Sequence, residues 1–388
     1  MMKMNSIGVY IHIPFCLSKC PYCDFNSVAS GSVPEARYAA CVLKEFNACV
    51  GKEGIDRQKG LGSVYFGGGT PSVFSPAAIG GIIRGVTDGF GPQEPAEVTL
   101  EVNPDTVDAG RLEGFRKAGV NRLSIGAQSL DDGLLKMLGR RHSAKKALNA
   151  FRMAREAGFE NIGIDLMFGL PGQTLALWKE TLKTAVALRP RHVSLYGLTI
   201  EEGTPFGRLL KNGSLSLLPE EVEIEMYKTA IDTLAEAGCV HYEISNFALP
   251  GYFSVHNSGY WQGIDCIGLG AGAHSYMSAP GWGRRWWNAL EPEQYMERIA
   301  LLGNAVEGSE TLKMGEASAE SLMLGLRMLT KGIVRSEFKQ RFGILPEDMF
   351  KRLKEFEAEG YIKNTADSII LTPKGALISN ELFSNMLA

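Results

Sequence analysis

The fold is decided by the stretch Gly8-Val-Tyr-Ile-His-Ile13, which is followed two residues later by Cys16-Leu-Ser-Lys-Cys20-Pro-Tyr-Cys23. The first stretch is mostly β-branched or aromatic, which predicts a buried strand. The three cysteines would then share one loop at the carboxyl end of that strand. Because β/α barrels carry their active sites at this end of the strands, the position favours a functional loop.

The order of an apolar run, a glycine- or proline-marked loop and a helical stretch repeats from Ile7 to about Thr199. The predicted strands are Gly8–Ile13, Ser63–Phe66, Val98–Val102, Arg122–Gly126, Ile162–Met167 and His192–Thr199. Helical periodicity fills the gaps, as at Ala144–Ala157 and Leu175–Leu188. Alternating strands and helices predict a parallel α/β sheet, and the repeat favours a partial (β/α)6 barrel of the TIM type over a doubly wound sheet.

Two further parts are expected after the barrel. Pro219, several first-turn acids and Gly238 mark a long helix. Residues 244–288 are rich in Gly, Tyr, Trp and Asn with little periodicity, which predicts a loop-dominated segment laid across the barrel. From about Gly308 the helical pattern resumes and ends in short apolar runs, which suggests a winged-helix-like module. The expected domains are residues 1–240, the barrel core; 241–305, a loop-rich extension; and 306–388, a small C-terminal helical, winged-helix-like domain.

Composition limits the possible partners. The chain has 388 residues, 45% hydrophobic and 21% charged, and a formal net charge of -3, the balance of a soluble globular protein. Its charges are spread along the chain and are balanced in the C-terminal part, which argues against nucleic acid as a partner. No apolar run approaches the roughly 18 residues of a transmembrane segment and no signal-peptide cleavage site is present, so we expect a cytoplasmic location.

Three of the seven cysteines fall between positions 16 and 23, a spacing that indicates metal ligation in a reducing compartment. Three thiolates on one tight loop can hold three irons of a 4Fe-4S cubane and leave the fourth iron open. Zinc is disfavoured because it needs a fourth ligand and His12 lies back in the strand. The scattered cysteines are interpreted as structural thiols; they are Cys41, Cys49, Cys239 and Cys266.

Several motifs together resemble the radical SAM superfamily, and within it the oxygen-independent coproporphyrinogen III oxidases and the related HemW haem chaperones. The motifs are Cys-x3-Cys-x2-Cys at Cys16 to Cys23, Tyr22 to Phe25, Gly67-Gly-Gly-Thr-Pro71, Glu101-Val-Asn-Pro104, Ser124 to Ser129, Asp165 to Gly172, Tyr242 to Phe247 and His256-Asn-Ser-Gly-Tyr-Trp261. The resemblance implies a 4Fe-4S cluster on Cys16, Cys20 and Cys23 whose open iron chelates S-adenosylmethionine. It also implies cofactor-binding roles for Tyr10, Tyr22, Gly68, Gly69, Thr70, Glu101, Gln128, Arg140 and Asp165.

Strand parity supports part of this assignment. In Ile162-Gly-Ile-Asp-Leu-Met167 the aliphatic residues share one parity, so Asp165 points to the other side, which in a barrel can be the interior. A buried carboxylate needs a partner, and a ligand hydroxyl, an amine or Arg140 would serve. Glu101 and Gln128 also end apolar strands. A purely structural hydrogen-bonding role remains open for all three.

His256 is predicted as a cofactor-binding residue because its motif resembles the chaperone branch and an imidazole is a natural axial ligand of haem iron. The alternative is a hydrogen bond within a loop. The tryptophans 282, 286 and 287 lie near Arg284 and Arg285, a set that suits a tetrapyrrole with propionates or a helix interface equally. Gly268-Leu-Gly-Ala-Gly272 lacks the context of a dinucleotide site, so that interpretation is rejected.

Two differences between this chain and the oxidase branch bear on the choice between a haem chaperone and an oxidase. The oxidase branch carries a cysteine two positions after the third cluster ligand, where this chain has Phe25, and it has a longer arm before the first strand. Both differences favour a haem chaperone over the alternative enzyme, an oxygen-independent coproporphyrinogen III oxidase of haem biosynthesis. The expected partners are haem, recipient haemoproteins and an electron donor for the cluster. The sequence leaves a homodimer open and leaves the role of radical catalysis undecided.

Overall fold

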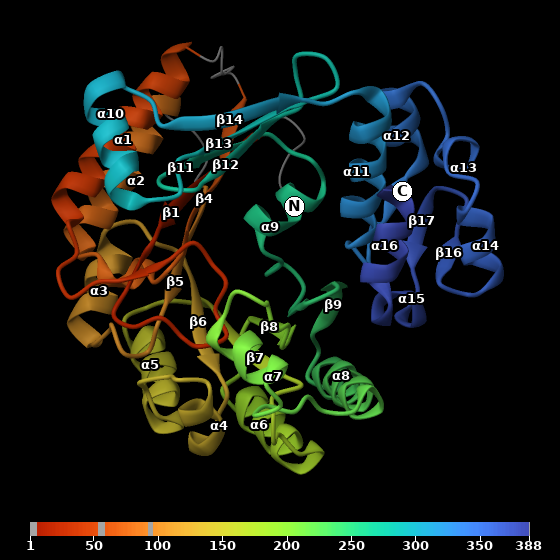
Figure 1. Ribbon diagram of the computed structural model, residues 1–388, viewed down its shortest axis with the longest axis horizontal. Helices are drawn as coiled ribbons and strands as arrows, with labels where there is room; N and C mark the ends of the chain where they lie inside the picture. Colours follow the sequence, from red (N-terminus) through yellow and green to blue (C-terminus); the bar gives the residue numbers. More distant parts are fainter. Residues whose placement is uncertain (1–5, 53–58, 92–95, 388) are drawn as a thin grey trace.

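The computed structural model describes residues 6–52, 59–91 and 96–387 (Figure 1). Its main feature is a twelve-stranded sheet whose central strands run parallel in the order β1-β4-β5-β6-β7-β8. These are the six predicted strands, at Ser6–Ile13 (β1), Gly60–Gly68 (β4), Glu97–Val102 (β5), Arg122–Gln128 (β6), Asn161–Phe168 (β7) and His192–Gly197 (β8). The predicted α/β barrel with parallel strands is confirmed.

Helices cover the outer face of the curved sheet (Figure 1). They are α1 (Glu35–Lys52), α2 (Pro76–Phe90), α3 (Ala109–Lys117), α4 (Asp132–Met137), α5 (Ala144–Glu156), α6 (Leu175–Ala187) and α8 (Glu220–Glu236). The short helix α7 (Pro205–Lys211) instead lies against the loop that contains Pro21 and Tyr22. The predicted helices at 144–157, 175–188 and 219–238 correspond to α5, α6 and α8 and are confirmed.

Strand parity separates the core from the barrel interior. Val9, Ile11 and Ile13 of β1 are fully buried in the cluster of apolar side chains that β1 shares with α1 and α2. The intervening Tyr10 lies on the other face of the strand, where its ring stacks on Tyr65 of β4 with centroids 6.2 Å apart. The interior of the barrel is therefore lined by polar and aromatic side chains, whereas the helix-facing side is aliphatic.

Both edges of the central sheet are extended by later segments. β11 (Cys266–Leu269) pairs parallel with β1, and β12 (His274–Met277), β13 (Arg284–Asn288) and β14 (Val306–Thr311) follow antiparallel. At the other edge β10 (Asn246–Ala248) and β9 (Val240–Glu243) pair antiparallel beside β8. The segment 244–288, which we expected to be dominated by loops, therefore also contains four short strands. These strands are only three to five residues long and are joined by glycine-containing turns, so they leave no periodicity in the sequence.

Within the described residues the sheet does not close, because β9 and β14 are its two edges. The short helix α9 (Val255–Trp261) contacts both β4 and α11, and it lies between the sheet and the C-terminal domain (Figure 1). On the outer side α10 (Pro292–Leu302) packs against α1.

The C-terminal domain has its own apolar core, which includes Leu322, Leu326, Phe338, Phe356 and Ile369. Its elements are α11 (Met314–Leu326), β15 (Ile333–Val334), α12 (Arg335–Phe342), α13 (Pro346–Met349), α14 (Leu353–Ala358), β16 (Ile362–Asn364), β17 (Ser368–Leu371), α15 (Pro373–Leu377) and α16 (Ser379–Leu387). Helices and a three-stranded antiparallel sheet match the predicted winged-helix-like module. The domain boundaries stay a prediction. Among the described helices, none is long and apolar enough to cross a membrane.

Candidate metal and cofactor site

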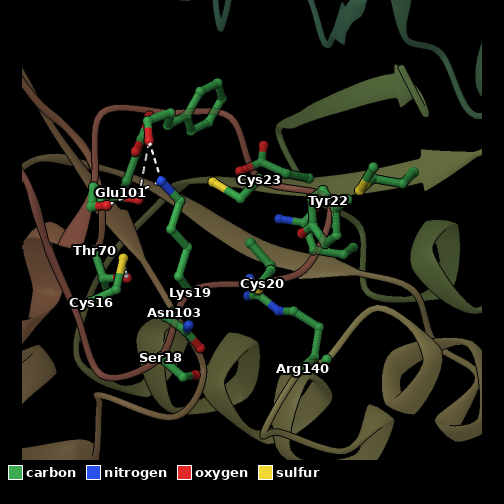
Figure 2. A pocket seen from close by; sticks show the side chains of 18 of the residues that line it. Cys16, Ser18, Lys19, Cys20, Tyr22, Cys23, Thr70, Glu101, Asn103 and Arg140 are labelled. Carbon is green, nitrogen blue, oxygen red and sulfur yellow. Dashed lines mark hydrogen bonds between the residues drawn. The ribbon is translucent and has the colours of Figure 1, made fainter. Parts of the chain in front are cut away.

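The three clustered cysteines lie on a loop that is closed at its neck. β2 (Phe15–Cys16) pairs with β3 (Val28–Ala29), and the amide of Ser30 donates to the carbonyl of Cys16 at 2.9 Å. Inside the loop the Lys19 ammonium donates to the carbonyls of Phe25 and Ser27, at 3.1 and 3.2 Å. Figure 2 shows Lys19 extended between Cys16 and Cys23. The shape of the loop is therefore fixed by hydrogen bonds between its own residues, most of them to backbone carbonyls.

The surroundings of the thiols differ from one cysteine to the next. Cys16 is buried, which raises the pKa of its thiol, and the Thr70 hydroxyl donates to its sulfur at 3.3 Å. Cys20 lies 3.8 Å from Nη1 of Arg140 (Figure 2). Both neighbours are hydrogen-bond donors, and donors of this kind stabilise a thiolate over a neutral thiol.

The spacing of the thiols bears on the kind of metal. Within the described ranges no three His, Cys, Asp or Glu side chains converge on a position that could hold a single metal ion. A zinc site requires that convergence, whereas in a cubane each thiolate binds a different iron. The assignment of the three cysteines to a cluster therefore stays a prediction from their spacing in the sequence.

A cavity of about 500 Å³ opens beside this loop, at the carboxyl ends of the parallel strands. It brings together most of the predicted site residues: Cys16, Cys20, Tyr22, Cys23, Gly68, Gly69, Thr70, Glu101, Gln128, Arg140 and Asp165 all line it. Parallel strands end at one edge of a sheet, so side chains distant in sequence meet there. Tyr10 and His256 are not among the lining residues.

Two carboxylates face the cavity, from the strands β5 and β7 on either side of β6. Glu101 is buried, which raises its pKa to about 7 although the Tyr65 hydroxyl donates to Oε1 at 2.8 Å; the negative charge of Asp165 adds to the rise. Burial also raises the pKa of Asp165. Asp165 also has a partner that the sequence analysis did not consider: the hydroxyl of Ser124 donates to both of its oxygens, at 2.9 and 3.0 Å, while Arg140 acts on it through its charge. Gly126 of β6 pairs with Asp165 of β7. Ser124 is two residues from Gly126 in the same strand, so its side chain points to the same face of the sheet as Asp165.

Arg140 has an unmet hydrogen bond at the cavity. Its Nη2 donates to the carbonyl of Gly126 at 2.8 Å, whereas its Nε is buried without a hydrogen-bond partner among the described residues. A buried donor without an acceptor is costly, so an anionic ligand group would be stabilised here. Nearby Gln128 has φ of 65°, a left-handed conformation that is uncommon for residues other than glycine and is frequent at functional sites.

The glycine motif packs against the cysteine loop. A Cβ on Gly68, whose φ is +113°, would lie 2.5 Å from the His12 ring. A Cβ on Gly69 would lie 2.8 Å from the backbone of Pro14, and the amide of Gly69 donates to Ile13 at 2.8 Å. The family resemblance assigns Gly68 and Gly69 to the cofactor site. The structure adds a second reason, because the two loops could not dock with larger residues between them.

His256 lies in a different part of the barrel. Its Nδ1 is 2.9 Å from the Ser63 hydroxyl, and its ring stacks on Tyr65 with centroids 5.0 Å apart. Burial, with a smaller contribution from the charge of Arg122, lowers its pKa to about 3. The backbone amide of His256 and that of Val255 donate to the Glu97 carboxylate, both at 3.0 Å. These contacts favour the structural alternative for His256.

The tryptophan and arginine side chains predicted between residues 282 and 287 do not gather around one site. Trp282 stacks near Phe342 and Trp287 near His274, and the Arg285 guanidinium pairs with Glu310 and Glu320. These pairings match the helix- and strand-interface alternative better than a tetrapyrrole cradle. Conversely, the sequence analysis missed Ser124, Tyr196 and Asn103 as lining residues. All three lie in strands or just after them near the carboxyl end, a positional signal that could have identified them.

Comparison with known proteins agrees with this geometry. The model of the radical SAM superfamily matches residues 10–185, and that of the HemN C-terminal domain matches residues 316–378. The heme chaperone HemW of Bacillus subtilis (strain 168) is 38% identical over 382 residues, which are 98% of this chain and 99% of that protein. The heme chaperone HemW of Escherichia coli (strain K12) is 36% identical over 392 residues, with full coverage of both chains.

The solved structure of the coproporphyrinogen III oxidase HemN from Escherichia coli, described as a radical SAM enzyme, superposes with a TM-score of 0.82. It is 22% identical, over 98% of this chain and 90% of that one, which shows a shared fold. The full-length similarity to the two HemW proteins is more specific than this shared fold. The chain belongs to the HemW haem chaperone family of the radical SAM superfamily.

Proposed function

We propose that this protein binds haem and delivers it to recipient haemoproteins, and that it carries a 4Fe-4S cluster and S-adenosylmethionine. The observation that carries the proposal is the identity of 38% to the Bacillus subtilis heme chaperone HemW over essentially both full chains. The cavity supports the cofactor part, because three thiols of one loop line it together with two carboxylates and a partly unsatisfied arginine.

Cys16, Cys20 and Cys23 would hold the cluster, which in this superfamily supplies an electron to the sulfonium of S-adenosylmethionine. The Lys19 ammonium keeps the loop folded, and the Arg140 guanidinium lies beside Cys20. Arg140 would also bind the methionine carboxylate through its free Nε. Glu101 and Asp165 would accept hydrogen bonds from the ribose hydroxyls or the amine, and Tyr22, Gly68, Gly69, Thr70 and Gln128 complete the wall.

Tyr10 would act indirectly, through residues that line the cavity. Its hydroxyl is 3.0 Å from Nδ1 of His12, and its ring lies against Tyr65, whose hydroxyl holds Glu101. It can therefore fix the position of Glu101 through Tyr65 without lining the cavity. We accordingly propose a positioning role for Tyr10 in place of direct contact with the cofactor.

His256 stays a predicted haem ligand, with the structural hydrogen bond to Ser63 as the alternative. The variant His256→Ala separates the two. Loss of haem affinity with unchanged iron content supports ligation. Unchanged haem affinity, with a lowered midpoint of thermal unfolding, assigns the histidine to the barrel interior.

The proposal includes partners and a location. An electron donor would reduce the cluster, and recipient haemoproteins would take the haem. We also propose a cytoplasmic location, which agrees with the absence of a membrane-spanning helix among the described residues. Nothing in the structure supports the homodimer that the sequence left open.

Haem titration of the anaerobically reconstituted protein tests the function. We expect a Soret band that saturates, together with transfer of the haem to an added apo-haemoprotein. The alternative activity is decarboxylation of coproporphyrinogen III, and the sequence difference at Phe25 argues against it. Turnover of coproporphyrinogen without haem binding would overturn the proposal in favour of that activity.

A further inference from the structure

The cysteine loop is tied to the rest of the barrel by a separate contact near each cysteine. Cys16 is fixed by the β2–β3 pairing and by the Thr70 hydroxyl. On the Cys20 side, the amide of Phe206 donates to the carbonyl of Pro21 at 3.0 Å. The segment after Cys23 runs outward, and its Phe25 is 69% exposed. The Lys19 bonds join this segment only to the loop itself, so its anchor must come from another residue.

Asn26 supplies that anchor. Its side-chain Nδ2 donates to the carbonyl of Ala271 at 3.1 Å and to that of Leu290 at 3.0 Å. These carbonyls belong to the turn between β11 and β12 and to the turn between β13 and α10. One amide group therefore joins the Cys23 side of the loop to two segments from the other end of the chain. Both of its hydrogen atoms are used, which fixes the orientation of the side chain.

His12 holds the backbone of the same residue. Its Nε2 is 2.8 Å from the carbonyl oxygen of Asn26, and its Nδ1 is 3.0 Å from the Tyr10 hydroxyl. Because a carbonyl oxygen only accepts, Nε2 carries the proton and Nδ1 accepts from Tyr10. The Tyr38 hydroxyl closes the arrangement: it donates to the carbonyl of His12 and accepts from the amide of Ala271, each at 2.8 Å.

Two glycines of Gly268-Leu-Gly-Ala-Gly272, Gly270 and Gly272, are explained by this contact. Gly270 has φ of +100°, and a Cβ there would lie 2.4 Å from the carbonyl oxygen of His12. Gly272 has φ of +71°, and a Cβ there would lie 2.3 Å from Nδ2 of Asn26. The carboxylate of Glu45 holds the amide of Gly270 at 2.9 Å. The motif thus forms a surface to which the cysteine loop can dock closely.

We propose that Asn26 is a positioning residue for the cluster, which holds the Cys23 side of the loop against the carbonyls of Ala271 and Leu290. The inference rests on the cluster of the proposed function. When the anchor is lost, Cys20 and Cys23 remain in the sequence but the Cys23 side is free to move. The cluster is then held less firmly and is more exposed to solvent.

The test uses Asn26→Asp in the full chain, because aspartate keeps the shape of the side chain and removes both donors. Wild type and variant are reconstituted anaerobically, and iron release to a ferrous chelator is followed by absorbance. We expect release from the variant to be about tenfold faster, as the loss of two hydrogen bonds predicts. The electron paramagnetic resonance signal of the reduced cluster, and its change on adding S-adenosylmethionine, should differ from wild type.

Asn47→Asp is the matched control, since it makes the same change at an exposed position of α1. Asn26→Ala removes the donors without adding a charge and should release iron at least as fast as Asn26→Asp. Circular dichroism spectra of the cluster-free forms should be the same for wild type and all three variants, which shows that the fold is intact.

The outcomes separate the inference from the proposed function. If the wild-type protein binds no iron, the proposed cluster is ruled out, and the inference about Asn26 is ruled out with it. Wild type that holds the cluster, with iron release and spectra unchanged in both Asn26 variants, overturns the inference alone. Equal acceleration in Asn26→Asp and Asn47→Asp, with none in Asn26→Ala, assigns the effect to charge and also overturns it.

Discussion

The two ends of the barrel interior contain similar residues and are built in opposite ways. At the carboxyl ends of the strands, Glu101, Asp165 and Arg140 surround a cavity of about 500 Å³, and the Nε of Arg140 has no partner among the described residues. Deeper in the interior, His256 is enclosed between Ser63 and Tyr65. Both regions place polar groups among apolar neighbours, but only the first borders the cavity.

The difference shows how to distinguish a site from a structural polar group. A buried polar residue whose hydrogen bonds are complete has no free energy to gain from a ligand. A residue that keeps an unmet donor or a raised carboxylate pKa beside a cavity gains by binding one. This criterion favours Arg140 and Glu101, which border the cavity, as site residues, and it favours His256 as a structural residue of the barrel interior.

The largest expected effect is at the thiols. Replacing Cys16, Cys20 and Cys23 together by serine should abolish bound iron and the brown absorbance after anaerobic reconstitution, because serine does not replace thiolate as a ligand of the cluster. The measurements are iron and sulfide analysis. Cys239→Ser is the control and should keep full iron, since Cys239 lies outside the cavity. Iron retained in the triple variant would remove the basis of the proposed site.

A smaller effect is expected at Arg140. The variant Arg140→Gln should weaken binding of S-adenosylmethionine about 10- to 100-fold, because a hydrogen bond to a charged group is lost. Calorimetric titration of the reconstituted protein with S-adenosylmethionine measures the dissociation constant. Arg152→Gln is the matched control: this side chain is exposed on α5, donates to Asn149 and lies outside the cavity. Equal affinity in the two variants would mean that the unmet Nε does not mark a ligand position.

The smallest effect concerns the pH dependence of stability at His256. Burial lowers the pKa of His256 from 6.5 to about 3, so between these values the unfolded chain takes up a proton that the native state does not. The free energy of unfolding should therefore fall as pH falls below about 6.5, by at most about 1.4 kcal/mol per pH unit. In His256→Gln this dependence should be shallower between pH 6 and about pH 4.5.

Denaturant titrations of the cluster-free protein at several pH values measure this dependence. The other buried histidines, such as His142 and His241, are present in both proteins, so the difference in slope isolates His256. Identical slopes would show that His256 is hydrated in the native state, and would return it to the list of groups that can bind a ligand.

Much of the fold and of the site could be predicted because the signals are local. The spacing of Cys16, Cys20 and Cys23 places three thiols on one loop, and the parity of β7 places Asp165 opposite the aliphatic residues. The edge strands could not be predicted, since β10 to β13 have three to five residues each and their pairing partners are distant in sequence. The partner of Asp165 was missed for a similar reason: Ser124 is 41 residues away.

The sequence by itself determined the cysteine loop, the parallel barrel strands and the family, because each depends on residues close together or on motifs in a fixed order. Only the tertiary structure decided which polar groups share a cavity and which are already satisfied. It moved Tyr10 and His256 out of the cavity wall and joined Asn26 to Ala271 and Leu290. Such contacts depend on how the sheet curves and how its edges are extended, and no local spacing of residues records that geometry.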